Sequence, residues 1–174
     1  WRLAMPLPPS SLSSARLPAG PEQDDVAMSG PRILISNDDG HFSAGIAALE
    51  RAAASVSDDV WVLAPERKRS SMGHQISLHE PFAVTRLTER RYACSGTPAD
   101  CAIAALAWLF ADSAKPDLVL SGVNEGRNIG EDIAYSGTMA IAREASFWGI
   151  PALAFSAPKE LDFGAAELAQ WLAG

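Results

Sequence analysis

The chain has 174 residues, of which 48% are apolar and 20% are charged, a composition typical of one globular domain with a buried core. Its formal net charge of -7 argues against a broad basic surface for a nucleic acid duplex, whose phosphates are held mainly by clustered Lys and Arg. A small anionic ligand is not excluded, because a few local donors or a metal ion are enough to bind it.

The first 30 residues are expected to form no regular structure. Five prolines occur there among many Ser, Ala and Gly residues, and neither helical nor strand periodicity is present. We interpret residues 1–30 as a disordered leader and residues 31–174 as the folded domain. Met28 shortly precedes the first apolar segment and is a candidate for the natural start, in which case the leader is not native.

From Pro31 onwards, short β-rich segments alternate with longer Ala-rich segments, which is typical of a mostly parallel α/β sheet covered by helices. A last helix is expected to begin near Asp162 and to continue at Gly174, so the C-terminal part of the domain is expected to be missing. The other expected elements are strands at 32–36, 60–64, 118–121 and 152–156, helices at 44–56, 98–111 and 138–148, and an antiparallel excursion with extended segments at 75–78, 82–86 and 91–95.

The cysteine and hydropathy patterns exclude further classes of protein. Cys94 and Cys101 form no CxxC pair and no Cys/His cluster at zinc spacing, so we expect reduced core thiols and no structural zinc site. No segment reaches the roughly 18 consecutive apolar residues of a membrane span. Residues 1–27 lack the continuous apolar segment of a signal peptide. We therefore expect a cytoplasmic protein without a membrane partner.

Three loops that follow predicted strands are the first place to look for a ligand site. In open α/β sheets, ligands bind beyond the carboxyl ends of the strands. Residues 37–40, with the sequence Asn-Asp-Asp-Gly, follow the first strand, residues 64–70 follow the second, and residues 122–128 follow the strand at 118–121. We expect these three loops to lie near one another.

Asp38 and Asp39 are the candidate catalytic residues. Adjacent side chains on a strand point to opposite faces, so these carboxylates converge only where the backbone turns, and Gly40 permits that turn. Converging carboxylates repel unless a cation offsets their charge, and Mg²⁺ or Mn²⁺ also accepts hydroxyl and amide oxygens. Ser70 and Asn124 offer such oxygens from the neighbouring loops. Taken alone, Asp-Asp-Gly is equally consistent with a surface turn.

A second group of residues suits phosphate. Ser136 is placed to cap the following helix, and the small residues beside it, Gly137 and Thr138, leave backbone N–H groups open to an anion. The simpler alternative is a helix cap and a flexible turn. The run 67–69, Arg-Lys-Arg, is most simply a solvated loop, although beside a phosphate site it could attract an anionic substrate. Among the histidines, only His41 and His74 are candidates for a catalytic role.

Several motifs follow one another along the chain: residues 32–40, 64–70, 73–74, 96–101, 121–124 and 135–138. Together they resemble the SurE family of survival-protein nucleotidases. The resemblance spans residue 32 to about residue 170. It implies a Rossmann-like, three-layer α/β fold. It also implies a divalent-metal-dependent phosphatase that hydrolyses nucleoside 5′- and 3′-monophosphates.

The resemblance also assigns residues to the site. One Mg²⁺ or Mn²⁺ ion per subunit is expected on four ligands: Asp38, Asp39, Ser70 and Asn124. The expected phosphate-binding residues are Asn37, Asn128, Ser136, Gly137 and Thr138. The full-length protein is expected to form a homodimer or homotetramer, because the family usually continues into a C-terminal segment that assembles subunits. The chain departs from the family at Ala44 and Arg127, where proline is usual, and in its ending at Gly174.

The expected mechanism is metal-assisted hydrolysis, in which the ion polarises a phosphoryl oxygen and a water molecule attacks phosphorus in line. Asp38 is a candidate for the base. Three alternatives stay open. A phosphatase with an aspartyl-phosphate intermediate also places Asp after the first strand, but its two Asp residues are usually separated by one residue. A Rossmann-like protein can also bind nucleotides without cleaving them. A truncated chain can also be inactive.

Overall fold

The computed structural model describes residues 20, 30–158, 168–170 and 172. The predicted disordered leader lies almost entirely outside the described residues, as does the predicted start of the last helix near Asp162. Residues 168–170 are helical, and Leu168 is buried against the same side of the domain as the first helix.

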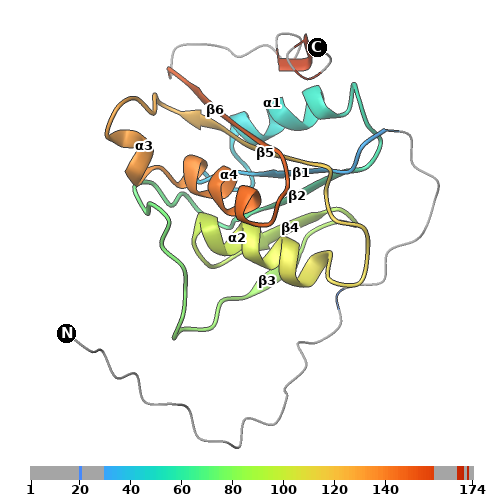
Figure 1. Ribbon diagram of the computed structural model, residues 1–174, viewed down its shortest axis with the longest axis horizontal. Helices are drawn as coiled ribbons and strands as arrows, with labels where there is room; N and C mark the ends of the chain where they lie inside the picture. The colour runs from blue at the N-terminus through green and yellow to red at the C-terminus, as the bar shows by residue number, and fades with distance from the viewer. Residues whose placement is uncertain (1–19, 21–29, 159–167, 171, 173–174) are drawn as a thin grey trace, which may run out of the picture.

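A six-stranded sheet forms the centre of the domain, in the order β3-β4-β2-β1-β5-β6 (Figure 1). All neighbouring strands pair in parallel except β3 and β4, which are antiparallel. The predicted Rossmann-like α/β fold with a mostly parallel sheet is therefore confirmed. The strands are β1 (Ile33–Ser36), β2 (Val60–Pro65), β3 (Val84–Arg86), β4 (Arg91–Cys94), β5 (Leu118–Glu125) and β6 (Ala152–Ala157).

Helices cover both faces of this sheet and make three layers (Figure 1). One face is covered by α1 (Ala44–Ala53), and the other by α2 (Pro98–Ala104), the π-helical turn η1 (Ala105–Leu109) and α4 (Gly137–Phe147). A short helix, α3 (Asp132–Tyr135), precedes α4.

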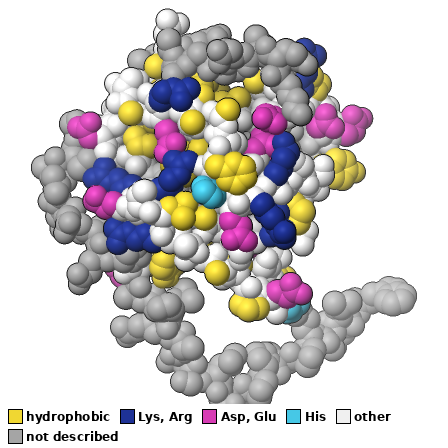
Figure 2. Space-filling model, turned by 180° about the vertical axis from the view of Figure 1, so that it is seen from behind, with side chains coloured by type: hydrophobic (Ala, Val, Ile, Leu, Met, Phe, Trp, Pro, Cys, Tyr) yellow, Lys and Arg dark blue, Asp and Glu magenta, His cyan; other side chains and the backbone are white. Residues whose placement is uncertain are grey.

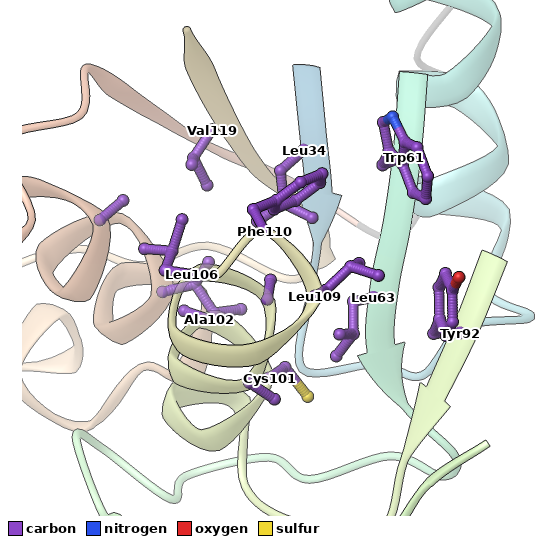
Figure 3. Packing of buried hydrophobic residues seen from close by; sticks show 14 of the residues in the cluster. Leu34, Trp61, Leu63, Tyr92, Cys101, Ala102, Leu106, Leu109, Phe110 and Val119 are labelled. Carbon is purple, nitrogen blue, oxygen red and sulfur yellow. The ribbon is translucent and has the colours of Figure 1, made fainter. Parts of the chain in front are cut away.

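The central strands are buried on both faces, which explains their nearly continuous apolar sequence. Alternate side chains of β1 divide between the two layers: Ile33 and Ile35 pack under α1, whereas Leu34 joins the cluster under α2, η1 and α4. Figure 3 shows this second cluster, in which Leu106 and Phe110 approach Leu34 from the helical layer. The strand at 32–36 was thus correctly predicted from its apolar run.

The predicted extended segment at 75–78 is wrong. Its backbone pairs with side chains at the start of α2 and not with a neighbouring strand. Thr97 Oγ1 donates to the carbonyl of Gln75 (2.6 Å), and Ser77 N donates to Asp100 Oδ1 (2.9 Å). These bonds attach the segment to the start of α2 and not to the sheet. Of the predicted antiparallel excursion, β3 and β4 remain.

Other boundaries also differ from the prediction. The strand predicted at 118–121 continues to Glu125, because β6 pairs with it again at Asn124 and Glu125 after an irregularity. The helix predicted at 98–111 ends as a π-helical turn at Leu109. The prediction did not include α3. The extra length of β5 matters most, because it carries part of the predicted loop 122–128 onto the sheet.

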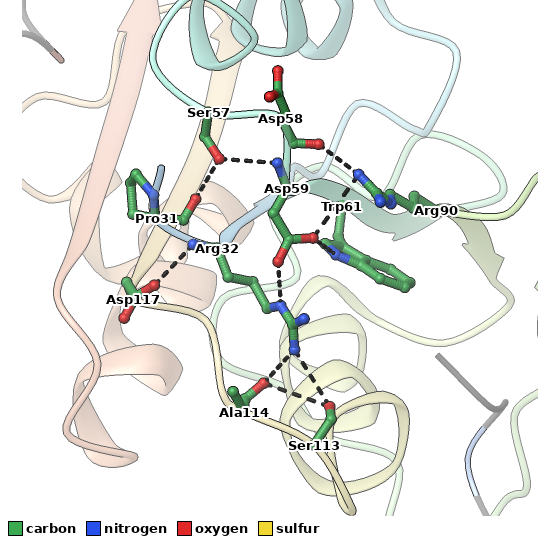
Figure 4. A network of polar contacts seen from close by, with 10 residues as sticks. All are labelled: Pro31, Arg32, Ser57, Asp58, Asp59, Trp61, Arg90, Ser113, Ala114 and Asp117. Atoms are coloured by element: carbon green, nitrogen blue, oxygen red, sulfur yellow. Dashed lines mark hydrogen bonds and ion pairs between the residues drawn. The ribbon is translucent and has the colours of Figure 1, made fainter. Parts of the chain in front are cut away.

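A polar network joins the amino ends of β1 and β2 (Figure 4). The carboxylate of Asp59 is buried and accepts hydrogen bonds from Arg32 Nε (2.7 Å) and Trp61 Nε1 (2.6 Å). Ser57 Oγ links Asp59 N (2.9 Å) to the carbonyl of Pro31. The network therefore connects the amino ends of β1 and β2, at the edge of the sheet opposite the carboxyl ends of these strands.

Charged side chains of both signs are interspersed over the surface. Figure 2 shows one face, on which Lys and Arg alternate with Asp and Glu without forming a continuous basic patch. Among the residues that the structure describes, no helix has the length and apolar character needed to cross a bilayer. Cys94 and Cys101 are free and buried, as predicted.

Candidate active site

The carboxyl end of β1 lies at a switch point of the sheet, where neighbouring strands connect in opposite directions. Strand β1 pairs with β2 on one side and with β5 on the other, so the connections from β1 and β5 diverge there. A crevice at such a switch point is the usual ligand site of an open α/β sheet. Residues 37–40 occupy this position.

Asn37 folds the turn that follows β1. Its Oδ1 accepts a hydrogen bond from Gly40 N (3.0 Å), and its Nδ2 donates to the carbonyl of Gly40 (3.1 Å) and to Ser43 Oγ (2.7 Å). Gly40 has a φ of 103°, which favours glycine. The polar atoms of Asn37 thus bond within the turn and to the residue that caps α1, and Asn37 does not line the neighbouring pocket.

Asp38 is 4% exposed and faces the start of α4. Its Oδ1 accepts a hydrogen bond of 2.6 Å from Thr138 Oγ1. Burial, together with the neighbouring charge of Asp39, raises the pKa of Asp38 above its usual value of 3.8, although Thr138 and Lys68 act in the opposite direction. Asp38 is therefore a carboxyl group that binds its proton more tightly than an exposed one.

Asp39 is 5% exposed and faces β5 and the loop after β2. Its Oδ2 accepts a hydrogen bond of 2.8 Å from Glu125 N. Its Oδ1 is buried without a hydrogen bond of good geometry, and the ammonium group of Lys68 forms an ion pair with it. Hydrogen bonding to Asp39 is the largest cause that raises the pKa of Lys68, and the negative charge of Asp39 adds to it. Lys68 also contacts Glu125 Oε2 at 3.4 Å.

A pocket of about 250 Å³ opens beside Asp38, whereas the neighbouring Asp39 does not line it. It brings together five of the predicted site residues from separate segments: Asp38, Ser70, Asn124, Asn128 and Ser136. The loops after β1, β2 and β5 therefore meet, as expected from their positions at the carboxyl ends of parallel strands.

The two asparagines of the pocket are held by their amide nitrogens. Asn124 Nδ2 donates to the carbonyl of Gly126 (2.9 Å), and Asn128 Nδ2 donates to Ser156 Oγ (2.6 Å). This assignment leaves the carbonyl oxygen of each side chain as an acceptor. For Asn124, this oxygen is the kind of atom that binds a cation.

The start of α4 presses against Asp38. Ser136 caps the helix through a hydrogen bond of 3.2 Å from Met139 N to its Oγ, and it lines the pocket. A Cβ atom on Gly137 would lie 2.7 Å from Asp38 Cβ, so only glycine fits there. The hydroxyl of Thr138 is turned to Asp38. Ser136 thus lines the pocket, whereas Gly137 and Thr138 position Asp38.

The histidines lie elsewhere. His74 Nε2 is 2.8 Å from Glu144 Oε2, and its ring stacks on Phe147 with 5.7 Å between centroids. His41 packs edge-on against Phe42. Burial lowers the pKa of His41, and the nearby charge of Arg91 adds to this. Neither histidine lines the pocket.

Three residues of the site were not singled out from the sequence. Glu125 and Asp132 line the pocket, and Lys68 contacts Asp39. Arg127 and Tyr135, which the sequence motifs included, line the pocket as well. Glu125 could have been found only by recognising that the strand predicted at 118–121 continues past Gly122 to Glu125. Lys68 was placed in a solvated loop, since nothing in a basic tripeptide shows which of its three side chains turns inward.

Replacing Asp38 by asparagine is expected to stabilise the protein by about 1 kcal/mol at pH 7 in EDTA, a usual gain where a functional group is held against its preference. The folded state binds the Asp38 proton more tightly than the unfolded chain does. The free energy of unfolding therefore falls as pH rises from 3.8, the usual pKa, through the raised pKa of the folded state. Urea unfolding should show a gain that shrinks as pH falls towards 4. The exposed Asp112→Asn serves as control; a destabilised D38N protein at pH 7 contradicts the prediction.

Comparisons with known proteins agree with this architecture. A model of the family "Survival protein SurE" matches residues 33–173. The chain is 50% identical over 125 residues to the 5′-nucleotidase SurE of Methylocella silvestris, which covers 72% of this chain and 49% of that protein. It is 49% identical over 134 residues to the 5′-nucleotidase SurE of Myxococcus xanthus, covering 76% and 50%. The chain thus spans about half the length of these curated relatives.

A solved structure shows the same arrangement. The crystal structure of the SurE protein from Aquifex aeolicus superposes with a TM-score of 0.76 at 41% sequence identity, covering 82% of this chain and 59% of that chain. The motif resemblance, the family match and the shared fold lead to one conclusion. The chain belongs to the survival protein SurE family.

Proposed function

We propose that this protein is a divalent-metal-dependent phosphatase that hydrolyses nucleoside 5′- and 3′-monophosphates to nucleoside and phosphate. The observation that carries the proposal is the buried pair Asp38 and Asp39 at the carboxyl end of β1, beside a pocket lined by Ser70 and Asn124. Membership of the SurE family and the name 5′-nucleotidase of the curated relatives support a phosphate-ester substrate.

The residues of the site fit a hard divalent cation. Asp39 Oδ1 is a buried acceptor that faces a cationic group, the ammonium of Lys68, and Asn124 keeps its Oδ1 available. Within the described residues, no group of three or more His, Cys, Asp or Glu could hold a metal ion. The proposed ligands are therefore two carboxylates with the neutral oxygens of Ser70 and Asn124, a set that suits Mg²⁺ or Mn²⁺ better than Zn²⁺.

The proposed chemistry divides between the two sides of the pocket. A divalent ion bound there supplies Lewis acidity for a phosphoryl oxygen and lowers the pKa of a water molecule. Asp38 is the proposed base for the attacking water, and the hydrogen bond from Thr138 Oγ1 to its Oδ1 orients the carboxylate. Asn128 and Ser136, which line the pocket, hold the substrate phosphate, and the exposed Arg127 attracts its charge.

A screen of phosphate release tests the proposal. The 5′- and 3′-monophosphates of adenosine and guanosine are incubated with Mg²⁺, Mn²⁺ or EDTA, using this chain and a version extended at its C-terminus. Release that needs the metal and stops in EDTA is expected. Nucleotide binding without release would instead favour a non-hydrolytic binding protein, and a phosphorylated aspartate trapped on the protein would favour the aspartyl-phosphate mechanism.

Replacing Gly137 by alanine is expected to lower kcat by about tenfold to a hundredfold, because a displacement of about 1 Å in a catalytic group has this effect. The new Cβ would lie 2.7 Å from Asp38 Cβ and 2.8 Å from Pro98 Cγ, so Asp38 must shift. Steady-state kinetics at saturating metal measure the loss. Ser146→Ala, late in the same helix and exposed, is the control. An unchanged kcat in folded G137A would show that Asp38 tolerates the shift.

A further inference from the structure

Lys68 holds the buried carboxylate of Asp39. It comes from the loop after β2, and its ammonium group forms an ion pair with Asp39 Oδ1. The Asp39 side chain is 3% exposed, whereas that of Lys68 is 48% exposed, so the charged end reaches inward from the surface. The ammonium therefore lies at the one carboxylate oxygen of Asp39 that is not fixed by Glu125 N.

An ammonium group and a divalent cation compete for the same oxygen. Both carry positive charge, so they repel each other at close range, and a carboxylate oxygen buried on its other sides has little room for both. Without any cation, the buried charge of Asp39 would be costly. Lys68 offsets this cost when no metal ion is bound.

The surroundings allow the side chain of Lys68 to move while the loop stays in place. The loop backbone is anchored by hydrogen bonds from Arg69 N to the carbonyl of Asp38 (2.6 Å) and from His41 N to the carbonyl of Pro65 (2.9 Å). The four-carbon stem of Lys68 is flexible. Glu125 Oε2, already 3.4 Å from its Nζ and on a side chain that is 46% exposed, provides a second partner.

We propose that Lys68 is a resident counter-cation of Asp39, which a divalent ion must displace towards Glu125, so that Lys68 sets the affinity of the site for its metal. The inference rests on the proposed metal site, but it does not depend on which phosphate ester is hydrolysed. The apparent association constant for the ion is the intrinsic constant multiplied by the fraction of molecules in which Lys68 is away from the site. Lys68 acts here on metal binding and is not a catalytic residue.

Direct measurement of Mn²⁺ binding tests the proposal. The electron paramagnetic resonance signal of free Mn²⁺ gives the dissociation constant without any turnover. For K68M, an affinity about tenfold higher than that of the unmodified protein is expected, as if Lys68 occupied the site about nine-tenths of the time. K68R keeps the charge and should bind Mn²⁺ no more tightly than the unmodified protein. R67M removes an equal charge from the exposed neighbouring residue of the same loop and controls for general electrostatics.

A second readout separates displacement from simple charge removal. Because Asp39 loses its partner, K68M should have a lower Tm than the unmodified protein in EDTA and a larger rise in Tm on addition of Mn²⁺. R67M should change neither value. Equal Mn²⁺ affinities for K68M and R67M would overturn the role of Lys68 while leaving the metal site intact. If none of these proteins bound Mn²⁺, the proposed metal site itself would be wrong, and the inference with it.

Discussion

Asp39→Asn is expected to lower kcat/KM for metal-dependent phosphate release by about a thousandfold, which corresponds to roughly 4 kcal/mol of lost transition-state stabilisation. The asparagine has the same shape and can still accept the hydrogen bond from Glu125 N. It removes the negative charge at the position where the metal is proposed, and its amide group would face the ammonium of Lys68. The loss is therefore one of charge and not of folding.

Asp132→Asn is a matched control for Asp39→Asn. Asp132 lines the pocket but is not one of the proposed ligands, and its replacement makes the same change of charge. Its effect on kcat/KM is expected to stay below about tenfold, the range of a screened surface charge. Mn²⁺ binding by both variants is measured in parallel. Normal metal-dependent turnover by folded D39N would rule out Asp39 as a ligand.

Asp59→Ala is expected to lower the free energy of unfolding by about 3–5 kcal/mol, the usual effect of removing one partner from a buried ion pair. The change leaves Arg32 Nε and Trp61 Nε1 without their shared acceptor (Figure 4). Total stabilities of such domains are about 5–15 kcal/mol, so the loss is a large part of the whole. Urea unfolding measures it.

The position of Asp59 allows its effect on stability to be separated from activity. The residue lies at the amino end of β2, whereas the pocket lies at the carboxyl ends of the parallel strands. At a temperature well below its Tm, D59A should therefore keep the kcat/KM of the unmodified protein. Asp117→Ala is the control, since exposed Asp117 accepts only the backbone N–H of Arg32 among the described residues. A D59A protein within 1 kcal/mol of the D117A protein would contradict the predicted loss.

Elements with strong local signals were predicted well from the sequence. The apolar run of β1 was found because both of its faces are buried, and the helix predicted to begin at residue 98 does begin at Pro98. The segment 75–78 was predicted wrongly, because its alternating pattern gave no sign that Ser77 would pair with the side chain of Asp100. A local pattern cannot show a partner that is distant in the chain.

The sequence by itself determined which loops meet at the proposed site. Polar loops that follow parallel strands meet at one edge of the sheet whatever their details, because strand direction fixes that edge. This placed Asp38, Ser70 and Asn124 in a single pocket before any contact was known. The order of the motifs along the chain also identified the family correctly.

Only the tertiary structure decided what each side chain does within that site. Thr138 turned out to bond to Asp38, 100 residues away, and the backbone of Glu125 to Asp39, 86 residues away. Lys68 turned inward to Asp39, although it lies in a basic run with no sign of which side chain would do so. These contacts depend on how whole loops pack against one another, and packing is a property of the assembled chain that no local sequence pattern encodes.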